Sequence, residues 1–220
     1  MRPGRTLADM YQTMLDRLGP SGWWPARTPF EVAVGTILAQ NTNWSNAAKA
    51  IGNLRSADLL SPTELCKLSK DQLEILIRPS GYYRMKAARL MALLDFLDTH
   101  SQGEPDEQLS ALRKYSWMDL RPLLLSIKGV GPETADSILC YALEHPVFVV
   151  DAYTARIAQR HGLIHEEADY HELQALFMDS LHLDFKLCNE FHALLVRVGN
   201  GWCAKKAPHC SGCPLESFLE

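Results

Sequence analysis

The chain has little of what marks membrane, secreted or repeat proteins. Its 220 residues contain no apolar run approaching the roughly 18 residues that suggest a membrane span. The positively charged start, Met1–Arg5, has no apolar segment behind it, so we read no secretory signal. We find no internal repeat and no low-complexity linker. These absences predict a cytosolic protein, in which six cysteines serve as thiols or metal ligands rather than as disulfides.

Positive charge is also scarce. The chain has 22 Lys and Arg against 26 Asp and Glu, a formal net charge of −4, which argues mildly against a nucleic-acid partner. Local clusters matter more than the sum, because phosphate contacts depend on nearby Lys and Arg. Each cluster taken alone reads as a solvated helix face. The clusters are Arg78, Arg84, Lys86 and Arg89; then Arg113 and Lys114; then Lys205 and Lys206.

Strand patterns are nearly missing. The one strong strand-like run, Val147–Val150, is too short and isolated to support a sheet. Elsewhere apolar residues recur at helical spacing, and a hydrophobic content of 47% allows a sizeable core. We therefore expect an all-α fold. The predicted helices cover 7–18, 30–38, 45–54, 61–68, 70–77, 84–99, 107–112, 117–127, 171–181 and 187–198, and two more begin at Pro132 and near Ala152.

A glycine-containing hairpin, Ile127–Pro132, lies between two of these helices. Pro132 suits a first helical turn because its missing N–H would be unpaired there. Gly129 and Gly131 permit backbone conformations closed to other residues. The N–H groups at the start of the second helix could then bind a phosphate oxygen. For these residues alone, the simpler interpretation is a tight turn between helices.

A lone acid, Asp151, follows the apolar run Val147–Val150 and precedes the helix near Ala152. Aspartate is a frequent N-cap after an extended segment, which is the simpler interpretation of this residue. A capped, partly buried aspartate can also stay ionised near the helix N–H dipoles. Capping and catalysis are therefore compatible.

The stretch from Leu125 to Ile157, with its hairpin, spacing and aspartate, resembles the endonuclease III-like (HhH-GPD) superfamily of base-excision DNA glycosylases. Further segments resemble its endonuclease III-related, 3-methyladenine DNA glycosylase III-like branch, so that the likeness runs from about Trp24 to Gly199. These segments are Trp24-Pro25, Leu38–Thr42, Arg78–Tyr83 with Lys86-Ala87, and Ala135–Ala142.

The resemblance implies a two-lobed architecture. A six-helix lobe with the hairpin would cover 27–144, and a second lobe would combine 1–26 with 145–220, including the cysteine loop at 203–213. The implied partner is double-stranded DNA that contains a damaged base, bound by a monomer in a bacterial or archaeal cytosol or nucleoid. No membrane is involved in this interpretation.

The resemblance also implies a reaction. Asp151 matches the family's catalytic acid, whose carboxylate would stabilise the positive charge that the sugar acquires as the base departs. Bifunctional members carry a lysine where this chain has Glu133, which cannot form an imine. We expect a monofunctional glycosylase acting on an alkylated purine such as 3-methyladenine. The alternatives are a bifunctional glycosylase and AP lyase for oxidised pyrimidines, and a non-catalytic DNA-binding module.

Aromatic residues are candidates for the base pocket, because glycosylases hold the extruded base between aromatic or apolar surfaces. The expected pocket residues are Trp24, Pro25 and Trp44, although core packing would explain a tryptophan equally simply. Gln40 matches a position from which the family inserts a side chain into the gap left by the base. Its simpler interpretation is a polar residue that ends a helix. The other expected DNA contacts are Lys128, Gly129, Val130, Gly131, Lys205 and Lys206.

Three cysteines near the C-terminus have the spacing Cys203-x6-Cys210-x2-Cys213. They match the first three ligands of the family's [4Fe–4S] loop, but the fourth position is Leu219. Cys188, a carboxylate such as Glu216 or Glu220, or a non-protein ligand could complete the set. Zinc held with His209 or His192, or no metal at all, are the alternatives. The two remaining cysteines, Cys66 and Cys140, read as buried thiols.

Overall fold

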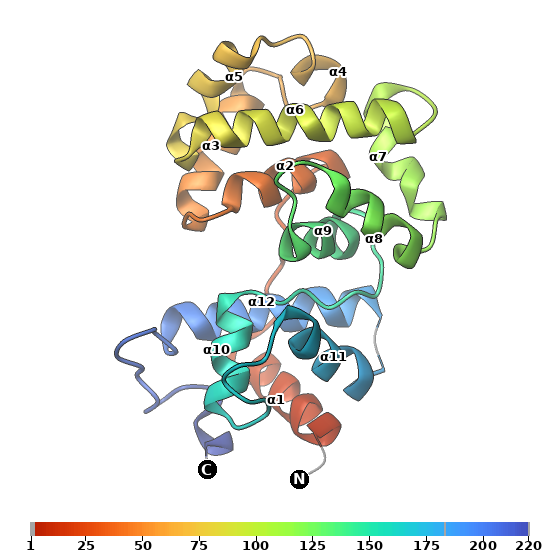
Figure 1. Ribbon diagram of the computed structural model, residues 1–220. Helices are drawn as coiled ribbons and strands as arrows, with labels where there is room; N and C mark the ends of the chain where they lie inside the picture. The colour runs from red at the N-terminus through yellow and green to blue at the C-terminus, as the bar shows by residue number, and fades with distance from the viewer. Residues whose placement is uncertain (1–2, 183, 220) are drawn as a thin grey trace. The chain divides into compact units, whose positions relative to one another are not determined.

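A computed structural model describes residues 3–182 and 184–219 of the chain (Figure 1). All regular structure in these residues is helical and none of them forms a strand, which confirms the predicted all-α class. Contacts divide the chain into two units. The central unit is Ala26–His145, and the terminal unit combines Met1–Pro25 with Pro146–Glu220. None of the described helices is both long and apolar enough to pass through a bilayer.

The central unit is built around one fully buried helix, α2 (Pro29–Ala39), in which every residue from Phe30 to Leu38 is buried. Helices from before and after the hairpin pack on it. These are α3 (Trp44–Ser56), α6 (Tyr83–His100), α7 (Gln108–Ala111) and α9 (Pro132–Ser137), with α4 (Pro62–Leu65), α5 (Lys70–Ile77) and α8 (Trp117–Ser126) completing the unit. Short 3₁₀ turns form at Arg78–Ser80, Pro105–Glu107 and Leu112–Lys114, and a π-helical turn, Ile138–Ala142, extends α9.

Local capping signals explain where these helices begin. The Thr28 side chain accepts a hydrogen bond from the Glu31 backbone N–H at the start of α2, and the Asn43 side chain accepts one from the Asn46 backbone N–H at the start of α3. Ser69 and Gln72 form a reciprocal capping box at α5. Such pairs satisfy N–H groups that the first helical turn leaves without partners, so short sequence motifs set the boundaries.

The terminal unit joins the first helix to the C-terminal third of the chain. Its helices are α1 (Pro3–Leu18), α10 (Ala152–Arg160), α11 (Tyr170–Ser180) and α12 (Phe185–Gly201), followed by a 3₁₀ turn at Glu216–Phe218. Three rings form the centre of its core: Phe148 stacks on Phe177 with centroids 4.0 Å apart, and both meet Phe191 edge-on. The apolar face of α12 thus covers the segment that leads to Asp151.

The apolar run Val147–Val150 is buried and extended, without a strand partner. Side chains of α11 bond to the backbone of Phe148 instead: Gln174 Nε2 donates to Phe148 O at 2.8 Å, and Phe148 N–H donates to Met178 Sδ at 3.3 Å. This segment delivers Asp151 to the start of α10 in a fixed position.

Two expectations about burial are wrong. Cys66 is exposed, because α4 is only four residues long and Leu65, beside Cys66, takes the core position. Lys86, expected on a solvated face, is 1% exposed. Cys140 is buried, as predicted.

Candidate active site and nucleic-acid interface

Asp151 is the N-cap of α10 and lies directly after the buried extended run. Its Oδ1 accepts hydrogen bonds from Thr154 N–H at 2.7 Å and from Thr154 Oγ1 at 2.9 Å. The predicted capping role is therefore confirmed. One carboxylate oxygen is used by the cap, and Oδ2 remains for other interactions.

The second carboxylate oxygen faces a histidine that the sequence analysis did not place here. His192 Nε2, on α12, lies 3.7 Å from Asp151 Oδ2, and the two side chains are only 9% and 13% exposed. Burial alone would raise the pKa of Asp151, but the charge of His192 and the two hydrogen bonds from Thr154 outweigh it and lower the pKa. The site therefore holds an ionised carboxylate at neutral pH.

In the central unit, Gln40 at the end of α2 is bonded to the hairpin. Its Nε2 donates to Gly129 O at 3.1 Å and to Thr134 Oγ1 at 2.8 Å, and its Oε1 accepts from Arg89 Nη1 of α6. The Arg89 side chain also lies against Gly129, where a Cβ atom would collide with it. Gln40, the hairpin and α6 thus form one hydrogen-bonded assembly.

The hairpin has the expected conformation at only one glycine. Gly129 has φ +89°, which side chains rarely allow, whereas Gly131 has φ −95°, which any residue adopts. Gly131 therefore does not use the conformational freedom that glycine permits. Lys128, Gly129 and Gly131 are exposed, but the Val130 side chain is buried and its N–H donates to Ile127 O at 3.0 Å.

Lys86 connects the end of α2 to the turn before α6. Its buried Nζ donates to Leu38 O at 2.8 Å and to Ser80 O at 2.6 Å. Just beyond that turn, Tyr82 is 64% exposed and has left-handed backbone, and Asn41 beside Gln40 has the same conformation. Two strained loops and the hairpin are therefore held together by two buried or half-buried cations, Lys86 and Arg89.

The expected pocket residues divide between the two units. In the terminal unit, the half-buried rings of Trp23 and Trp24 are 4.6 Å apart, and Pro25 is exposed. Asn189 Nδ2 of α12 donates to Trp23 O at 3.0 Å and fixes this segment. Trp44, in the central unit, is half-buried at the first position of α3.

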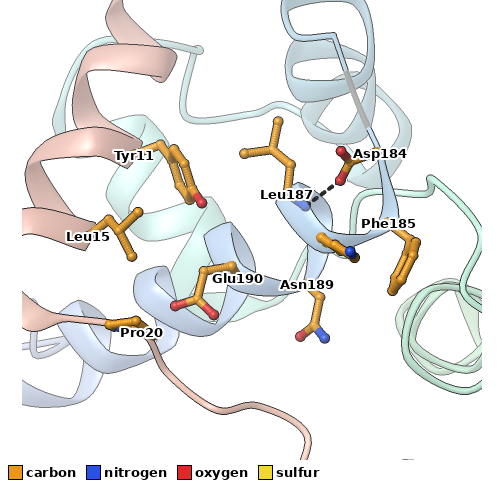
Figure 2. A pocket seen from close by; sticks show the side chains of 9 residues that line it. Tyr11, Leu15, Pro20, Asp184, Phe185, Leu187, Asn189 and Glu190 are labelled. Carbon is orange, nitrogen blue, oxygen red and sulfur yellow. Dashed lines mark hydrogen bonds between the residues drawn. The ribbon is translucent and has the colours of Figure 1, made fainter.

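A groove of about 520 Å³ separates α1 from the start of α12 in the terminal unit (Figure 2). Figure 2 shows Tyr11 and Leu15 on one wall and the Asp184–Glu190 segment on the other. Burial, together with the charges of Glu190 and Asp184, raises the pKa of Tyr11. Glu190 also accepts from Ser21 N–H at 2.7 Å and from Ser21 Oγ at 2.8 Å, so it anchors the connection that leads to Trp23. Neither Asp151 nor His192 lines the groove.

The geometry can be compared with known proteins. Residues 34–182 match the model of the HhH-GPD superfamily of base-excision DNA repair proteins. The chain belongs to this superfamily. It is a base-excision DNA glycosylase, and the family's partner is DNA.

Relatives of this HhH-GPD glycosylase span nearly its whole length. It is 44% identical over 209 residues to a protein of Methanocaldococcus jannaschii described as a candidate DNA repair glycosylase, which covers 95% of this chain and 93% of that one. It is 29% identical to endonuclease III of Thermotoga maritima, with 87% and 83% covered.

A solved structure, H. pylori 3-methyladenine DNA glycosylase bound to 1,N6-ethenoadenine, superimposes with a TM-score of 0.76 at 28% identity, covering 91% of this chain and 98% of that one. A covalent complex of endonuclease III with DNA has a TM-score of 0.81 at 22% identity, covering 99% and 95%, and shows that the fold is shared.

Three cysteines of the glycosylase surround one small cavity in the terminal unit. Cys203 and Cys213 are buried and Cys210 is exposed, and all three line the cavity together with Leu219. Burial, as the largest effect, raises the pKa of Cys213. Leu219, which stands where the family's cysteine loop has its fourth ligand, thus places an apolar side chain in this cavity. Glu216 also lines it, whereas Glu220 lies outside the described residues.

Arginines hold the cysteine loop in place. Arg160 Nη1 donates to Cys203 Sγ at 3.1 Å and to Ala204 O at 2.9 Å, and Arg17 Nη1 donates to Cys213 O at 2.9 Å. Lys205 and Lys206 are exposed on the same loop. Among the described residues, no three His, Cys, Asp or Glu side chains are arranged to hold a single metal ion. This finding applies to the three cysteines as well as to the zinc sets named in the sequence analysis.

Sequence reasoning named His192, Arg89 and Lys86 but did not assign them to these sites. His192 lies between Phe191 and Leu195 in a buried stripe of α12, and a polar residue in an apolar stripe was the available signal. Arg89 follows Lys86 by three positions, a spacing that places both on one helix face. Neither pattern predicts which residue the side chain contacts, because the contacts come from other elements of the fold.

Proposed function

We propose that this glycosylase is monofunctional and hydrolyses the N-glycosidic bond of an alkylated purine, with Asp151 as its catalytic carboxylate. The observation that carries the proposal is a partly buried, ionised carboxylate fixed at a helix N-terminus by Thr154 and His192. A preorganised negative charge costs no reorganisation when positive charge develops beside it.

The proposed reaction has two parts. The bond between C1′ and the base nitrogen breaks, its electron pair leaves with the base, and the carboxylate stabilises the oxocarbenium character of the sugar. The oxygen of water then bonds to C1′, and its proton passes to the carboxylate or to solvent. The phosphodiester backbone remains intact.

The absence of an amine at position 133 supports hydrolysis rather than lyase chemistry. Glu133 is exposed in the first turn of α9 and cannot form a Schiff base. Lys128, in the hairpin, is the nearest lysine in sequence. We expect borohydride to trap no covalent complex between the wild-type protein and DNA. Efficient trapping that disappears in Lys128→Ala would overturn the monofunctional proposal.

An alkylated purine is the proposed substrate class. A methylated purine carries positive charge and a labile bond, so stacking and cation–π attraction from an aromatic side chain such as Trp24 or Trp44 can favour it. The H. pylori relative, a 3-methyladenine glycosylase bound to an adenine derivative, supports this choice. The T. maritima relative, an endonuclease III, favours the second candidate, an oxidised-pyrimidine glycosylase and lyase.

We propose that the loops of the central unit contact the DNA backbone. Lys128, Gly129 and Gly131 are exposed and can face phosphate, and Gln40 would enter the gap left by the extruded base. Val130 contributes by packing rather than by contact, since its side chain is buried and its N–H is bonded. Lys205 and Lys206 add phosphate contacts in the terminal unit.

The decisive experiment measures base release and strand breakage separately. The wild-type protein and Asp151→Asn are incubated with methylated duplex DNA and with thymine glycol duplex. Release of 3-methyladenine with intact strands, lost in the variant while DNA binding is retained, supports the proposal. Release only from thymine glycol duplex would move the assignment to the second candidate, and binding without any release would favour a binding module.

We further propose that the cysteine loop holds a structural [4Fe–4S] cluster through Cys203, Cys210 and Cys213. The three thiols share one cavity, but the fourth position, Leu219, offers no ligand, so the residues match three of the four protein ligands such a cluster normally has. Purified protein should contain iron and acid-labile sulfide, and Leu219→Cys should increase the resistance of the visible absorbance to air. Iron-free protein in which the thiols of Cys203, Cys210 and Cys213 all react with a thiol reagent would overturn the cluster.

A further inference from the structure

The two oxygens of Asp151 have different partners. Oδ1 accepts both hydrogen bonds from Thr154, which fix the carboxylate to its own helix. Oδ2 faces His192 Nε2 at 3.7 Å, on a different helix. The orientation of the carboxylate about its last bond therefore depends on α12 as well as on α10.

Close packing sets the register between these two helices. Gly199 of α12 lies against Tyr153 of α10 so tightly that an added Cβ would collide with the ring. Tyr153 Oη donates to Asn200 Oδ1 at 2.7 Å, and Arg156 Nε donates to Cys203 O at 2.7 Å. His192 precedes Gly199 by seven residues, or about two helical turns, and so shares its face of α12.

Burying the His192 side chain costs free energy that apolar packing alone does not offset. It is 7% exposed in a stripe whose neighbours, Phe191 and Leu195, are apolar and buried. Burying a polar ring among apolar groups is unfavourable unless it gains a polar partner, and the carboxylate beside it is such a partner. The imidazole also supports the negative charge of Asp151.

We propose that His192 is a positioning residue for base excision, which holds Oδ2 of Asp151 in the orientation that faces the sugar. This inference rests on the proposed function of Asp151. His192 acts through Asp151 and does not itself touch the reacting atoms.

The test compares His192→Gln, which keeps an N–H donor, with His192→Leu, which keeps volume but no donor. Single-turnover release of 3-methyladenine from methylated duplex should fall by about 10- to 100-fold in His192→Leu and by less in His192→Gln, because small misplacements of a catalytic group are costly. The dissociation constant for the same duplex should stay within about twofold. His171→Gln, an exposed histidine on α11, serves as the matched control and should change neither quantity.

A pH profile separates positioning from loss of structure. Only variants whose melting temperature equals that of the wild type are used, and their rate of base release is measured across pH. In the His192 variants the acid limb of this profile should move to higher pH, because Asp151 loses the charge that lowers its pKa. The double variant Asp151→Asn/His192→Gln should be no slower than Asp151→Asn.

Two outcomes would overturn the inference: an unchanged rate and pH profile in a folded His192→Leu protein, or a further loss of rate in the double variant. Base release that persists in Asp151→Asn alone would instead overturn the proposed function. The failures of the two proposals are therefore distinguishable.

Discussion

At the scale of single residues, a buried ion pair holds the hairpin from both sides. Arg121 of α8 donates to both carboxylate oxygens of Asp136, at 2.7 and 3.0 Å, and the Asp136 side chain is fully buried. The pair joins α8 to α9, the two helices on either side of the hairpin. It was not visible in the sequence, because neither residue departs from an ordinary helical pattern.

We expect Arg121→Met to lower the free energy of unfolding by about 3–5 kcal/mol, because it removes the bidentate partner of a buried carboxylate. Urea unfolding monitored by circular dichroism measures the change. Lys67→Met, which breaks an exposed pair with Glu64, is the control and should leave the midpoint unchanged. Equal stability of wild type and Arg121→Met would show that the pair contributes nothing.

Lys86 makes the stability of the folded protein depend on pH. Burial, with a smaller effect from the charge of Arg89, lowers the pKa of Lys86 to about 8 from its ordinary value of 10.5. The unfolded chain then binds more protons than the folded protein between these values, so this group makes stability rise with pH across that window.

We expect the wild type to gain up to about 3 kcal/mol between pH 8 and 10.5 relative to Lys86→Met, which lacks the titrating group. Below about pH 8 the difference should be constant. Urea unfolding of both proteins at pH 7.5 and 10 measures the effect. Parallel pH dependence in the two proteins would contradict the low pKa.

At the scale of elements, the two hairpin glycines have different requirements. Gly129 has φ +89° and the side chain of Arg89 against it, whereas Gly131 has an ordinary φ and nothing within 4 Å of an added Cβ. Their sequence context is nearly symmetrical. The φ angle of Gly129 and the Arg89 side chain of α6 distinguish them.

Gly129→Ala should therefore lower the free energy of unfolding by more than about 1 kcal/mol and weaken binding to duplex DNA, because Arg89 must move and its contact with Gln40 changes. Gly131→Ala is the matched control and should unfold like the wild type. Thermal unfolding and fluorescence anisotropy with a labelled duplex measure the two effects. Equal effects of the two substitutions would be inconsistent with this assignment.

Most helices could be predicted because their signals are local. Capping residues and apolar spacing are contained in one or two turns, so α5 and α8 end within one residue of their predicted limits. The predicted helix 61–68 failed because Leu65 alone reaches the core there, and the chain turns after it. The run Val147–Val150 could not be interpreted locally, since its hydrogen-bond partners come from α11.

At the scale of the whole molecule, a chain of net charge −4 must bind an anionic polymer through a few local cations. Lys128, Lys205 and Lys206 are exposed, whereas Lys86 is buried and Arg89 is bonded to Gln40. The number of phosphate contacts, rather than the net charge, should set the salt dependence of binding.

The double variant Lys205→Ala/Lys206→Ala should reduce the slope of log K against log salt concentration by about 2, with a similar loss for every duplex sequence. Lys67→Ala removes an exposed lysine that is paired with Glu64, and should leave the slope unchanged. Titrations at several salt concentrations provide the slopes. An unchanged slope in the double variant would exclude the cysteine loop from phosphate contact.

The sequence by itself determined the helical class, the hairpin, the position of Asp151 and the lack of a lysine at position 133. Each of these is contained in a contiguous stretch, where spacing and residue type act locally. Only the tertiary structure decided that His192 faces Asp151 and that Gln40 is bonded to the hairpin. It also decided that Leu219 lines the cysteine cavity. These pairings join residues from separate elements, and burial and charge at such sites depend on how the helices pack.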